Sequence, residues 1–178
     1  FGVNMLALDH GRPQLLNLRD MVAAFVDFRE EVIGRRSRHE LGRARDRAQI
    51  LVGLAIAVAN IDAVIAIIRG APDPSAAREA LIGREWPVHG VESLVRLIDE
   101  PGRAVVDGAY RLNEAQAKAI LELRLARLTG LERDKIGDDL TAIAAKIGEF
   151  LDILTNRETL VALLRQELLE IKERFATP

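Results

Sequence analysis

Tyr110 is the only tyrosine of the chain, so it is the only candidate for a phenolic nucleophile. The chain has no cysteine, which excludes a thiol nucleophile, a disulfide and a zinc–cysteine site. Its three histidines, His10, His39 and His89, lie on separate segments without the His-x-x-x-His spacing typical of a metal site. We therefore predict no metal site, and for Tyr110 a role in packing or in an interface is the favoured alternative to nucleophilic attack.

Carboxylates and glycines also show no arrangement typical of catalysis. The adjacent pairs Asp99-Glu100 and Asp138-Asp139 would point in different directions on a helix, so we expect solvated charges. The glycines are scattered at expected turns and form no phosphate-binding loop. The sequence thus predicts no catalytic, cofactor-binding or metal-binding residue in this chain.

One stretch is rich in arginine. Its basic residues are Arg35, Arg36, Arg38, Arg43, Arg45 and Arg47. Glu40 lies at helical spacing from Arg36 and Arg43, and Asp46 interrupts the run, which favours a mixed, solvated helix face. The alternative is weak, salt-sensitive contact with the phosphates of a nucleic acid, with Arg36, Arg43 and Arg47 as candidates.

The composition indicates a helical protein. Hydrophobic residues make up 49% of the 178 residues and aromatic residues only 4%, a mixture that favours helices joined by aliphatic seams. The formal net charge of −2 gives no global basic field toward nucleic acid. The longest apolar run lies around Leu54–Asn60 and falls short of the roughly 18 residues of a membrane span.

Residues 1–17 predict a β-hairpin, because two short apolar runs flank the turn Asp9-His10-Gly11-Arg12-Pro13. An isolated hairpin is marginally stable, so we expect the remnant of a preceding domain and a chain cut from a longer polypeptide. Asn17 can cap a helix that begins at Leu18, and Gly34 is expected to weaken or kink it.

Two heptad stripes flank the middle of the chain. The first stripe ends before the interruption at Asn60, and the second is interrupted by a capping box at Thr155-Asn156-Arg157-Glu158 before it resumes. The first consists of Leu41, Ala44, Ala48, Leu51, Ala55 and Val58. The second consists of Ile136, Leu140, Ile143, Ile147, Phe150 and Leu154, and it resumes as Val161, Leu164, Leu168, Ile171 and Phe175.

The segment between the stripes predicts several short helices. They are expected at Ala63–Arg69, from a cap at Ser75 to near Gly83, at Glu92–Asp99, and from Glu114 to Leu128. The last begins with the capping box Asn113-Glu114-Ala115-Gln116 and is expected to close at Gly130. Residues from Arg84 to Gly108 are otherwise mixed, with several Gly and Pro positions.

Two striped segments on either side of a group of short helices predict a mainly α fold. This fold would be a long antiparallel coiled-coil arm with a small helical head. Residues 1–17 would be the hairpin remnant, 18–60 the outgoing helices, 61–130 the head and 131–178 the returning helices. Leu41–Val58 is expected to lie antiparallel to Ile136–Leu154. A compact helical bundle is the alternative that the pattern alone leaves open.

Several runs along the chain are more specific than its periodicity. They are Phe1–Leu8, Asn17–Val26, Arg29–Ile33 with Arg35-Arg36, Ala44–Leu51, Ala59–Asp62, Leu112–Ala117, Ile120–Leu125 and Leu128–Glu132. In this order, and over essentially the whole chain, they resemble the family of the bacterial DNA gyrase breakage-reunion subunit, part of a type IIA topoisomerase. The topoisomerase IV paralogue is similar but matches less closely around Ala44–Asp62.

The resemblance implies the arm and exit gate of an A2B2 enzyme that passes one DNA duplex through a break in another. In the family, the cleaving tyrosine and the DNA-wrapping propeller lie outside this segment, and the context of Tyr110 matches the head. ATP and Mg²⁺ are used through other domains, so none is expected here. The implied partners are a second copy, the gyrase B protein and, transiently, duplex DNA. No membrane partner is implied, and the expected location is the bacterial cytoplasm, with the nucleoid.

The helix expected at Glu114–Leu128 is apolar on more than one side, so we predict that it forms a two-fold dimer interface together with the Ala63–Arg69 helix. The predicted interface residues are Ile120, Leu121, Arg124, Leu125 and Leu128. Two other interpretations stay open: the same segment of topoisomerase IV, and a non-enzymatic coiled-coil dimerisation module.

Overall fold

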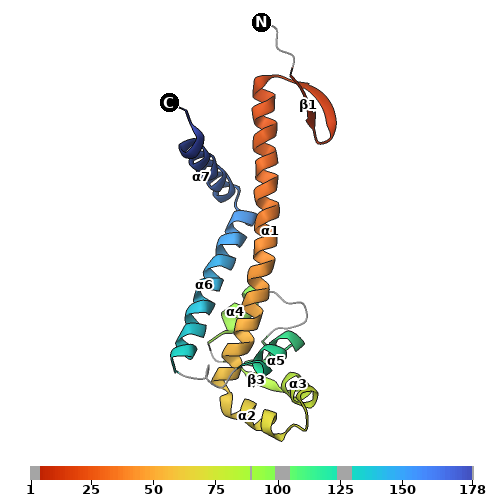
Figure 1. Ribbon diagram of the computed structural model, residues 1–178, viewed down its shortest axis with the longest axis vertical. Helices are drawn as coiled ribbons and strands as arrows, with labels where there is room; N and C mark the ends of the chain where they lie inside the picture. Colours follow the sequence, from red (N-terminus) through yellow and green to blue (C-terminus); the bar gives the residue numbers. More distant parts are fainter. Residues whose placement is uncertain (1–4, 89, 99–104, 124–129, 178) are drawn as a thin grey trace. The chain divides into compact units, whose positions relative to one another are not determined.

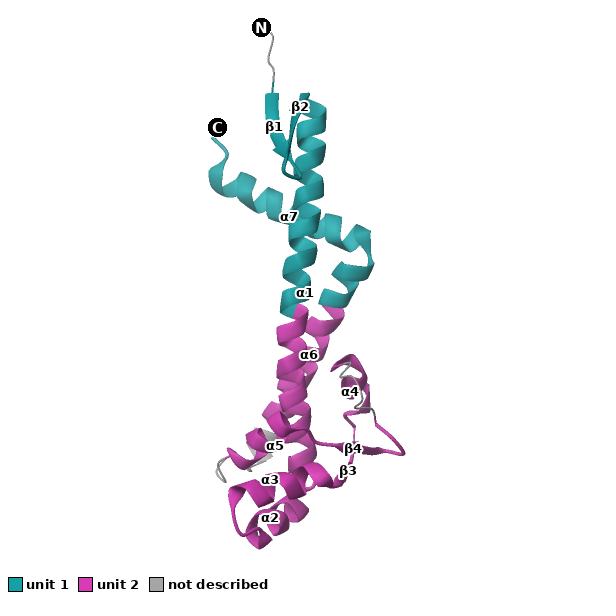
Figure 2. Cartoon of the chain, turned by 90° about the vertical axis from the view of Figure 1, so that its right-hand side faces the viewer, with its two compact units in different colours: residues 1–40, 150–178 teal, residues 41–149 magenta. Residues whose placement is uncertain are grey.

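The computed structural model describes residues 5–88, 90–98, 105–123 and 130–177 (Figure 1). Within this part there are seven helices and four short strands, so the predicted mainly α class is confirmed. The chain divides into two compact units, residues 1–40 with 150–178 (unit 1) and residues 41–149 (unit 2), shown in Figure 2. The predicted boundaries at 17, 60 and 130 do not coincide with this division, and they stay a prediction.

The N-terminal hairpin is present in unit 1. Strands β1 (Met5–Asp9) and β2 (Arg12–Leu16) pair antiparallel, with Asp9 opposite Arg12. The two turn residues, His10 and Gly11, both have positive φ, 47° and 75°. Such a turn matches the right-handed twist of the strands, so the Gly after His10 explains why the hairpin closes there.

Helix α1 (Leu18–Ala59) is continuous and contributes residues to both units. Its first turn is capped as predicted, because the Asn17 side chain accepts a hydrogen bond of 2.9 Å from the Asp20 amide. The predicted kink at Gly34 is wrong. A helical glycine costs about 1 kcal/mol relative to alanine, and burial of the neighbouring Ile33 offsets that cost.

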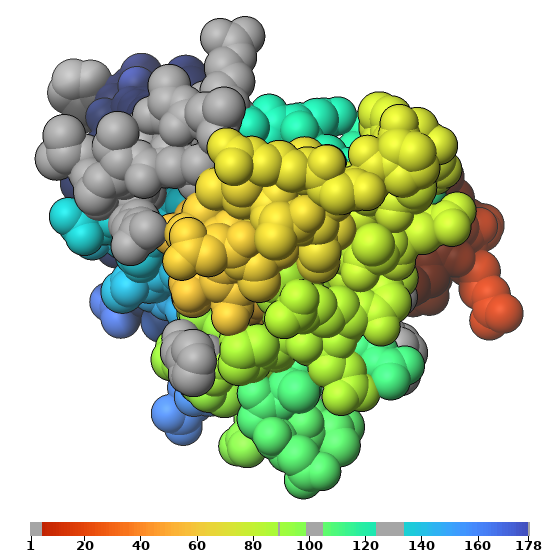
Figure 3. Space-filling model, turned by 90° about the horizontal axis from the view of Figure 1, so that it is seen from below, coloured from red at the N-terminus to blue at the C-terminus, as the bar shows by residue number. Residues whose placement is uncertain are grey.

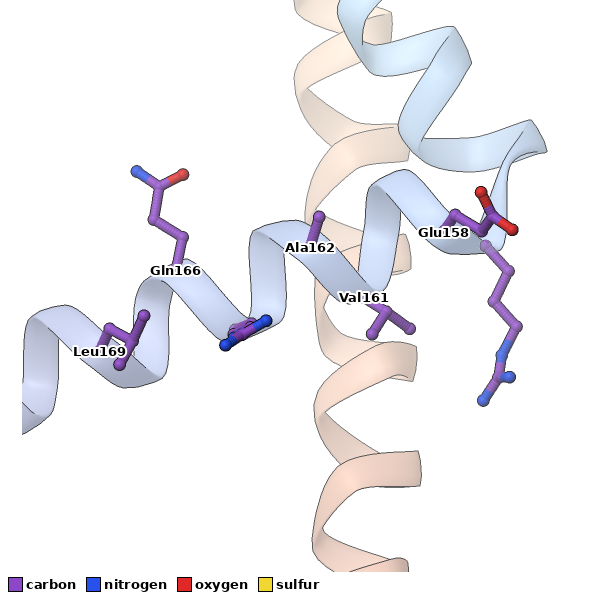
Figure 4. Close-up of a pocket in the computed structure, with 7 residues that line it drawn as sticks. Glu158, Val161, Ala162, Gln166 and Leu169 are labelled. Carbon is purple, nitrogen blue, oxygen red and sulfur yellow. The ribbon is translucent and has the colours of Figure 1, made fainter.

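The core of unit 1 joins α1 to the end of α6 (Gly130–Thr155) and to α7 (Arg157–Phe175). Ile33, Ile153 and Leu164 are buried together in one cluster. The break between α6 and α7 was predicted, but its cap is Asn156, whose side chain accepts from the Glu158 amide at 3.0 Å. Within this unit α7 crosses α1 instead of running alongside it (Figure 4).

In unit 2 the second half of α1 presents the predicted stripe. Leu41, Ala44, Ala48, Leu51 and Val58 are buried, and Ala55 is half-buried. The first part of α6 lies beside it and runs in the opposite direction (Figures 1 and 2). On α6, Leu140 and Ile147 are buried and Ile136 and Ile143 half-buried, which confirms the predicted seam within this unit.

After Asn60 the chain turns by 91° into α2 (Ile61–Gly70), followed by α3 (Pro74–Gly83). The cap of α3 is Asp73, whose carboxylate accepts from the Ala76 amide at 2.9 Å, so the prediction of Ser75 is wrong. Asp73 is the cap because Pro74, with its fixed φ and no amide hydrogen, is suited to the first helical position.

A second pair of antiparallel strands was not predicted. Strands β3 (Glu85–Pro87) and β4 (Ala109–Arg111) pair antiparallel, with Trp86 opposite Tyr110, and helix α4 (Glu92–Ile98) lies between them in the sequence. Strands of three residues are too short to show alternation, which is the main signal for a strand. Trp86 is 1% exposed and donates through Nε1 to the Leu81 carbonyl at 2.9 Å, so this strand pair contributes to the core of unit 2.

The resumed stripe on α7 is mostly exposed. Only Leu164 of its predicted members is buried, whereas Val161, Leu168, Ile171 and Phe175 are exposed. Among the described residues, no single helix is long and apolar enough to cross a membrane, and α1 and α2 meet that test only when taken as a bent pair.

Candidate functional site

The predicted gate helix is α5 (Glu114–Leu121), and its start agrees with the sequence. The Asn113 side chain accepts from the Gln116 amide at 2.8 Å, and the Gln116 side chain accepts from the Asn113 amide at 2.9 Å. This reciprocal arrangement is the predicted capping box. It satisfies two amide groups that a helix otherwise leaves without an intrahelical partner.

The predicted end of this helix is wrong. α5 ends at Leu121, where the Glu122 amide still bonds to the Lys118 carbonyl at 3.0 Å and the Leu123 amide bonds to the Ile120 carbonyl at 3.2 Å. The bond from Leu123 to Ile120 spans three residues instead of four, which is typical of the tight last turn of a helix. Gly130 does not close this helix but begins α6, so the boundary predicted from this glycine is wrong.

The structure places the five predicted interface residues in different settings. Ile120 is 3% exposed and belongs to the core of unit 2, as expected for the side of the helix that faces the head. Leu121 is half-buried and partly accessible. Arg124, Leu125 and Leu128 lie outside the described residues. The predicted dimer interface therefore stays a prediction, and Leu121 is its accessible described member.

Gln116 was recognised from the sequence only as part of the capping box, but it has a second role. Its side chain is fully buried, and Nε2 donates to the backbone carbonyl of Gln49 on α1 at 2.8 Å. The Tyr110 hydroxyl lies 3.3 Å from Nε2 and 3.4 Å from Oε1. Gln116 thereby links α1, β4 and α5, a contact across 67 positions that no local pattern reveals.

Gly53 on α1 makes room for this contact. A Cβ atom built at Gly53 would lie 2.8 Å from both Cβ and Cγ of Gln116. Carbon atoms in contact are normally about 3.5–4.0 Å apart, so only glycine allows α5 to approach this closely without a shift. The position of α5 is therefore set by a glycine and a buried amide rather than by an apolar stripe alone.

Helix α2 carries the other predicted part of the interface. Val64 is buried, whereas Ile68 is 40% exposed and Ile61, Ile65 and Ile67 are half-buried. α3 packs against both α2 and α5. Figure 3 shows the yellow surface of α2 on one face of unit 2. Unit 2 thus leaves aliphatic surface on α2 that its own core does not cover.

Tyr110 is placed as a packing residue would be. Its side chain is 3% exposed and its hydroxyl is hydrogen-bonded to Gln116. A nucleophile must reach a substrate in solution, and burial of this hydroxyl prevents such access. Among the described residues no group of three His, Asp or Glu side chains could hold a metal ion. His89 lies outside the described residues.

The arginine cluster separates into different environments. Arg36 forms an ion pair with Glu167 on α7, and Arg35 lies 3.6 Å from Glu31 one turn away. Arg45 donates through Nε to the Leu97 carbonyl at 3.2 Å and so ties α1 to the end of α4. Arg43 and Arg47 are exposed on α1. Of the three predicted phosphate-contact residues, Arg36 is thus engaged within unit 1.

A further ion pair in unit 1 joins Arg157 and Glu30 at 2.9 Å. The hydrogen bonds that Arg157 donates to the Glu30 carboxylate, followed by the charge of Glu30, raise the pKa of the Arg157 guanidinium above its usual value. A raised pKa means that Arg157 contributes to stability below its unfolded-state pKa and loses that contribution only as the pH rises through the folded value. The guanidinium therefore stays charged throughout the neutral range.

A hollow on α7 is lined by Arg157, Glu158, Val161, Ala162, Arg165, Gln166 and Leu169 (Figure 4). All seven residues come from one helix, so no second element of the described part of the chain forms an opposite wall. Ligand pockets normally bury most of their ligand between several elements. We therefore interpret the hollow as a helix face and not as a small-molecule site.

Comparison with known proteins places this architecture in a class. A sequence model of the family formed by the A subunits of DNA gyrase and topoisomerase IV matches residues 1–169, which is most of the chain. The chain therefore belongs to this gyrase and topoisomerase IV family, and the resemblance seen in the sequence is confirmed.

Within this family, several relatives are named as the A subunit of DNA gyrase. The chain is 52% identical over 179 residues to that of Granulibacter bethesdensis and 49% identical over 178 residues to that of Rickettsia bellii. It is 44% identical over 184 residues to that of Pseudomonas aeruginosa. These alignments cover 98–100% of this chain and 19–20% of the relatives, so the chain spans about a fifth of their length.

Proposed function

We propose that this chain is the coiled-coil and exit-gate segment of the A subunit of a DNA gyrase. In the whole enzyme, duplex DNA passes through a double-strand break at the expense of ATP, and this segment supplies dimerisation and gate opening rather than cleavage. The observation that carries the proposal is the 44–52% identity, along the whole chain, to proteins named as this gyrase component. The topoisomerase IV interpretation has less support, because these relatives carry the gyrase name.

The dimer surface is proposed to lie on the Ala63–Arg69 part of α2 and on Leu121, Arg124, Leu125 and Leu128. Ile68, which is 40% exposed, and Leu121, which is half-buried, leave aliphatic surface accessible, and this supports the assignment because accessible apolar surface is typical of interaction sites. Ile120, the fifth predicted interface residue, is buried within unit 2 and is proposed to support the helix from inside. A two-fold axis would let one such patch cover itself, and a patch of moderate size would let the gate part.

The remaining partners belong to the whole enzyme in this proposal. The gyrase B protein, ATP and Mg²⁺ act through other parts of the holoenzyme, and the chain itself needs no cofactor. Duplex DNA touches this segment only in transit, with Arg36, Arg43 and Arg47 as the proposed steering residues. The proposed location is the bacterial cytoplasm, with the nucleoid.

The proposal is tested by the oligomeric state of the chain. We expect a dimer at micromolar concentration by sedimentation velocity, and a monomer after the double substitution Leu125→Glu and Leu128→Glu, because two carboxylates cannot be buried unpaired in an apolar interface. Circular dichroism should show unchanged helix content. A charged double variant that still dimerises would place the interface elsewhere.

The matched control is the double substitution Leu125→Met and Leu128→Met, which keeps apolar side chains of similar volume at the same positions. Such exchanges usually cost less than about 1.5 kcal/mol, so this control should remain dimeric. A wild-type chain that is monomeric at every accessible concentration would refute the gate assignment itself.

A further inference from the structure

We propose that Gln116 is the positioning residue of the gate helix: its buried amide holds α5 at one place on α1 and so fixes how Leu121 and the following residues are presented to a second copy. The inference rests on the proposed function, because the position of α5 matters for the gate only if this helix carries the dimer surface. Gln116 would act through α5 and would not itself touch the partner.

The hydrogen bonds determine the orientation of the amide. Oε1 accepts from the Asn113 amide at 2.9 Å, and Nε2 donates to the Gln49 carbonyl at 2.8 Å. Rotating the amide by half a turn would place donor against donor and acceptor against acceptor. Because the side chain is fully buried, water cannot replace either bond.

The site on α1 that receives Gln116 is formed by the Gln49 carbonyl and Gly53, and we call it the Gln116 socket. Gln49 and Gly53 are four residues apart and therefore lie on one face of α1. The carbonyl fixes the position of α5 along α1, since the bond breaks when the helix slides. Gly53 fixes the separation, since a Cβ there would lie 2.8 Å from Gln116.

Apolar contacts alone would not define this position. Ala117 and Ile120 of α5 are also buried, but hydrophobic burial is non-directional, and apolar cores lose uniqueness before they lose stability. Leu121 follows Gln116 by five residues on the same short helix. A shift or rotation at Gln116 is therefore carried directly to Leu121.

The test compares Gln116→Met with the wild-type chain. Methionine keeps a similar length but cannot donate to Gln49 or accept from Asn113. The matched control is Gln166→Met, at an exposed glutamine on α7. Two quantities are measured in the full chain: the dimer dissociation constant by sedimentation equilibrium, and the distance between spin labels at Asp46→Cys and Lys118→Cys. Both label sites are exposed, and the absence of native cysteine makes labelling specific.

We expect Gln116→Met to broaden the distance distribution and to raise the dimer dissociation constant at least tenfold, which corresponds to about 1.4 kcal/mol. Trp86 fluorescence should still report a folded unit 2. The control should change neither quantity. A Gln116→Met chain with the wild-type distance distribution and dissociation constant would overturn the inference.

A second variant separates positioning from general stability. In Gln116→Glu, the protonated carboxyl can donate to the Gln49 carbonyl and accept from Asn113, whereas the carboxylate has no donor and faces a carbonyl oxygen. We expect near wild-type dimerisation at about pH 5 and at least tenfold weaker dimerisation at about pH 8, with no such change in Gln166→Glu. Equal dimerisation at both pH values would contradict the role of the Gln49 bond.

The two proposals fail differently. If the wild-type chain does not dimerise, the gate function is refuted, while the label distance in unit 2 still tests Gln116. If the chain dimerises and the label distance does not respond to Gln116→Met, only the positioning role is refuted.

Discussion

Replacing Gly53 by valine should destabilise unit 2, because this glycine allows the close approach of α5 to α1. A Cβ at this position would lie 2.8 Å from Cβ and Cγ of Gln116. Carbon contacts relax to about 3.5–4.0 Å, so α5 would have to retreat by roughly 1 Å, and the two methyl groups of valine add to this displacement. The retreat also lengthens the hydrogen bond from Gln116 to the Gln49 carbonyl, now 2.8 Å.

The magnitude follows from two opposing terms. Overpacking a core costs about 1–3 kcal/mol, and the gain in helix propensity from glycine to valine is only about 0.3–0.5 kcal/mol. The net loss should therefore be about 0.5–2.7 kcal/mol. Gly42 provides the control, because it lies in the same helix and unit and a Cβ there meets no atom within 4 Å. Gly42→Val should lie within about 0.5 kcal/mol of wild type, on the stabilising side.

Trp86 makes the assay specific for unit 2. It is the only tryptophan of the chain, it is 1% exposed, and it belongs to residues 41–149. Urea unfolding followed by its fluorescence reports the free energy of this unit, with circular dichroism as the probe for the remaining helices. Equal stability of Gly53→Val and Gly42→Val would refute the reasoning, since it would mean that α5 does not need the space at Gly53.

Two further predictions concern other parts of the chain. Ile33→Ala should lower the stability of unit 1 by about 2–5 kcal/mol, because Ile33 is 0% exposed and packs with Ile153 and Leu164. Faster hydrogen exchange in α7 would report this loss. The control Val22→Ala, at a side chain that is 55% exposed, should have little effect. The substitutions Arg43→Ala and Arg47→Ala should each reduce the slope of log affinity for duplex DNA against log salt by about 0.9, whereas Arg165→Ala should not. A slope that does not change in the first two variants would support the solvated helix face instead.

The parts of the fold that follow local rules could be predicted from the sequence. The cap at Asn17, the hairpin turn at His10-Gly11 and the capping box at Asn113 depend on neighbouring residues, and all three are present. The stripe from Leu41 to Val58 was also predictable, since a helix that buries one face repeats its apolar residues at fixed spacing.

The features that were missed depend on distant partners or on competition between neighbours. Ser75 and Asp73 are both good cap residues, and only Pro74 decides between them. The pairing of β3 with β4 joins residues separated by more than twenty positions through strands of three residues. Gln116 was visible as a cap, but its bond to Gln49 exists only once α5 has docked on α1.

The crossing of α7 over α1 shows what an apolar stripe can and cannot predict. The stripe identifies a helix face that needs a partner, but it does not give the angle at which the two helices pack. Glu167 on α7 pairs with both Arg29, at 2.8 Å, and Arg36. These arginines are seven residues apart, so they are separated by about 10.5 Å along α1. A helix parallel to α1 would offer each of them a different acidic residue, whereas one carboxylate held from both sides marks a crossing point. The same contact engages Arg36, which the sequence alone had left available for phosphate contact, because its partner lies 131 positions away.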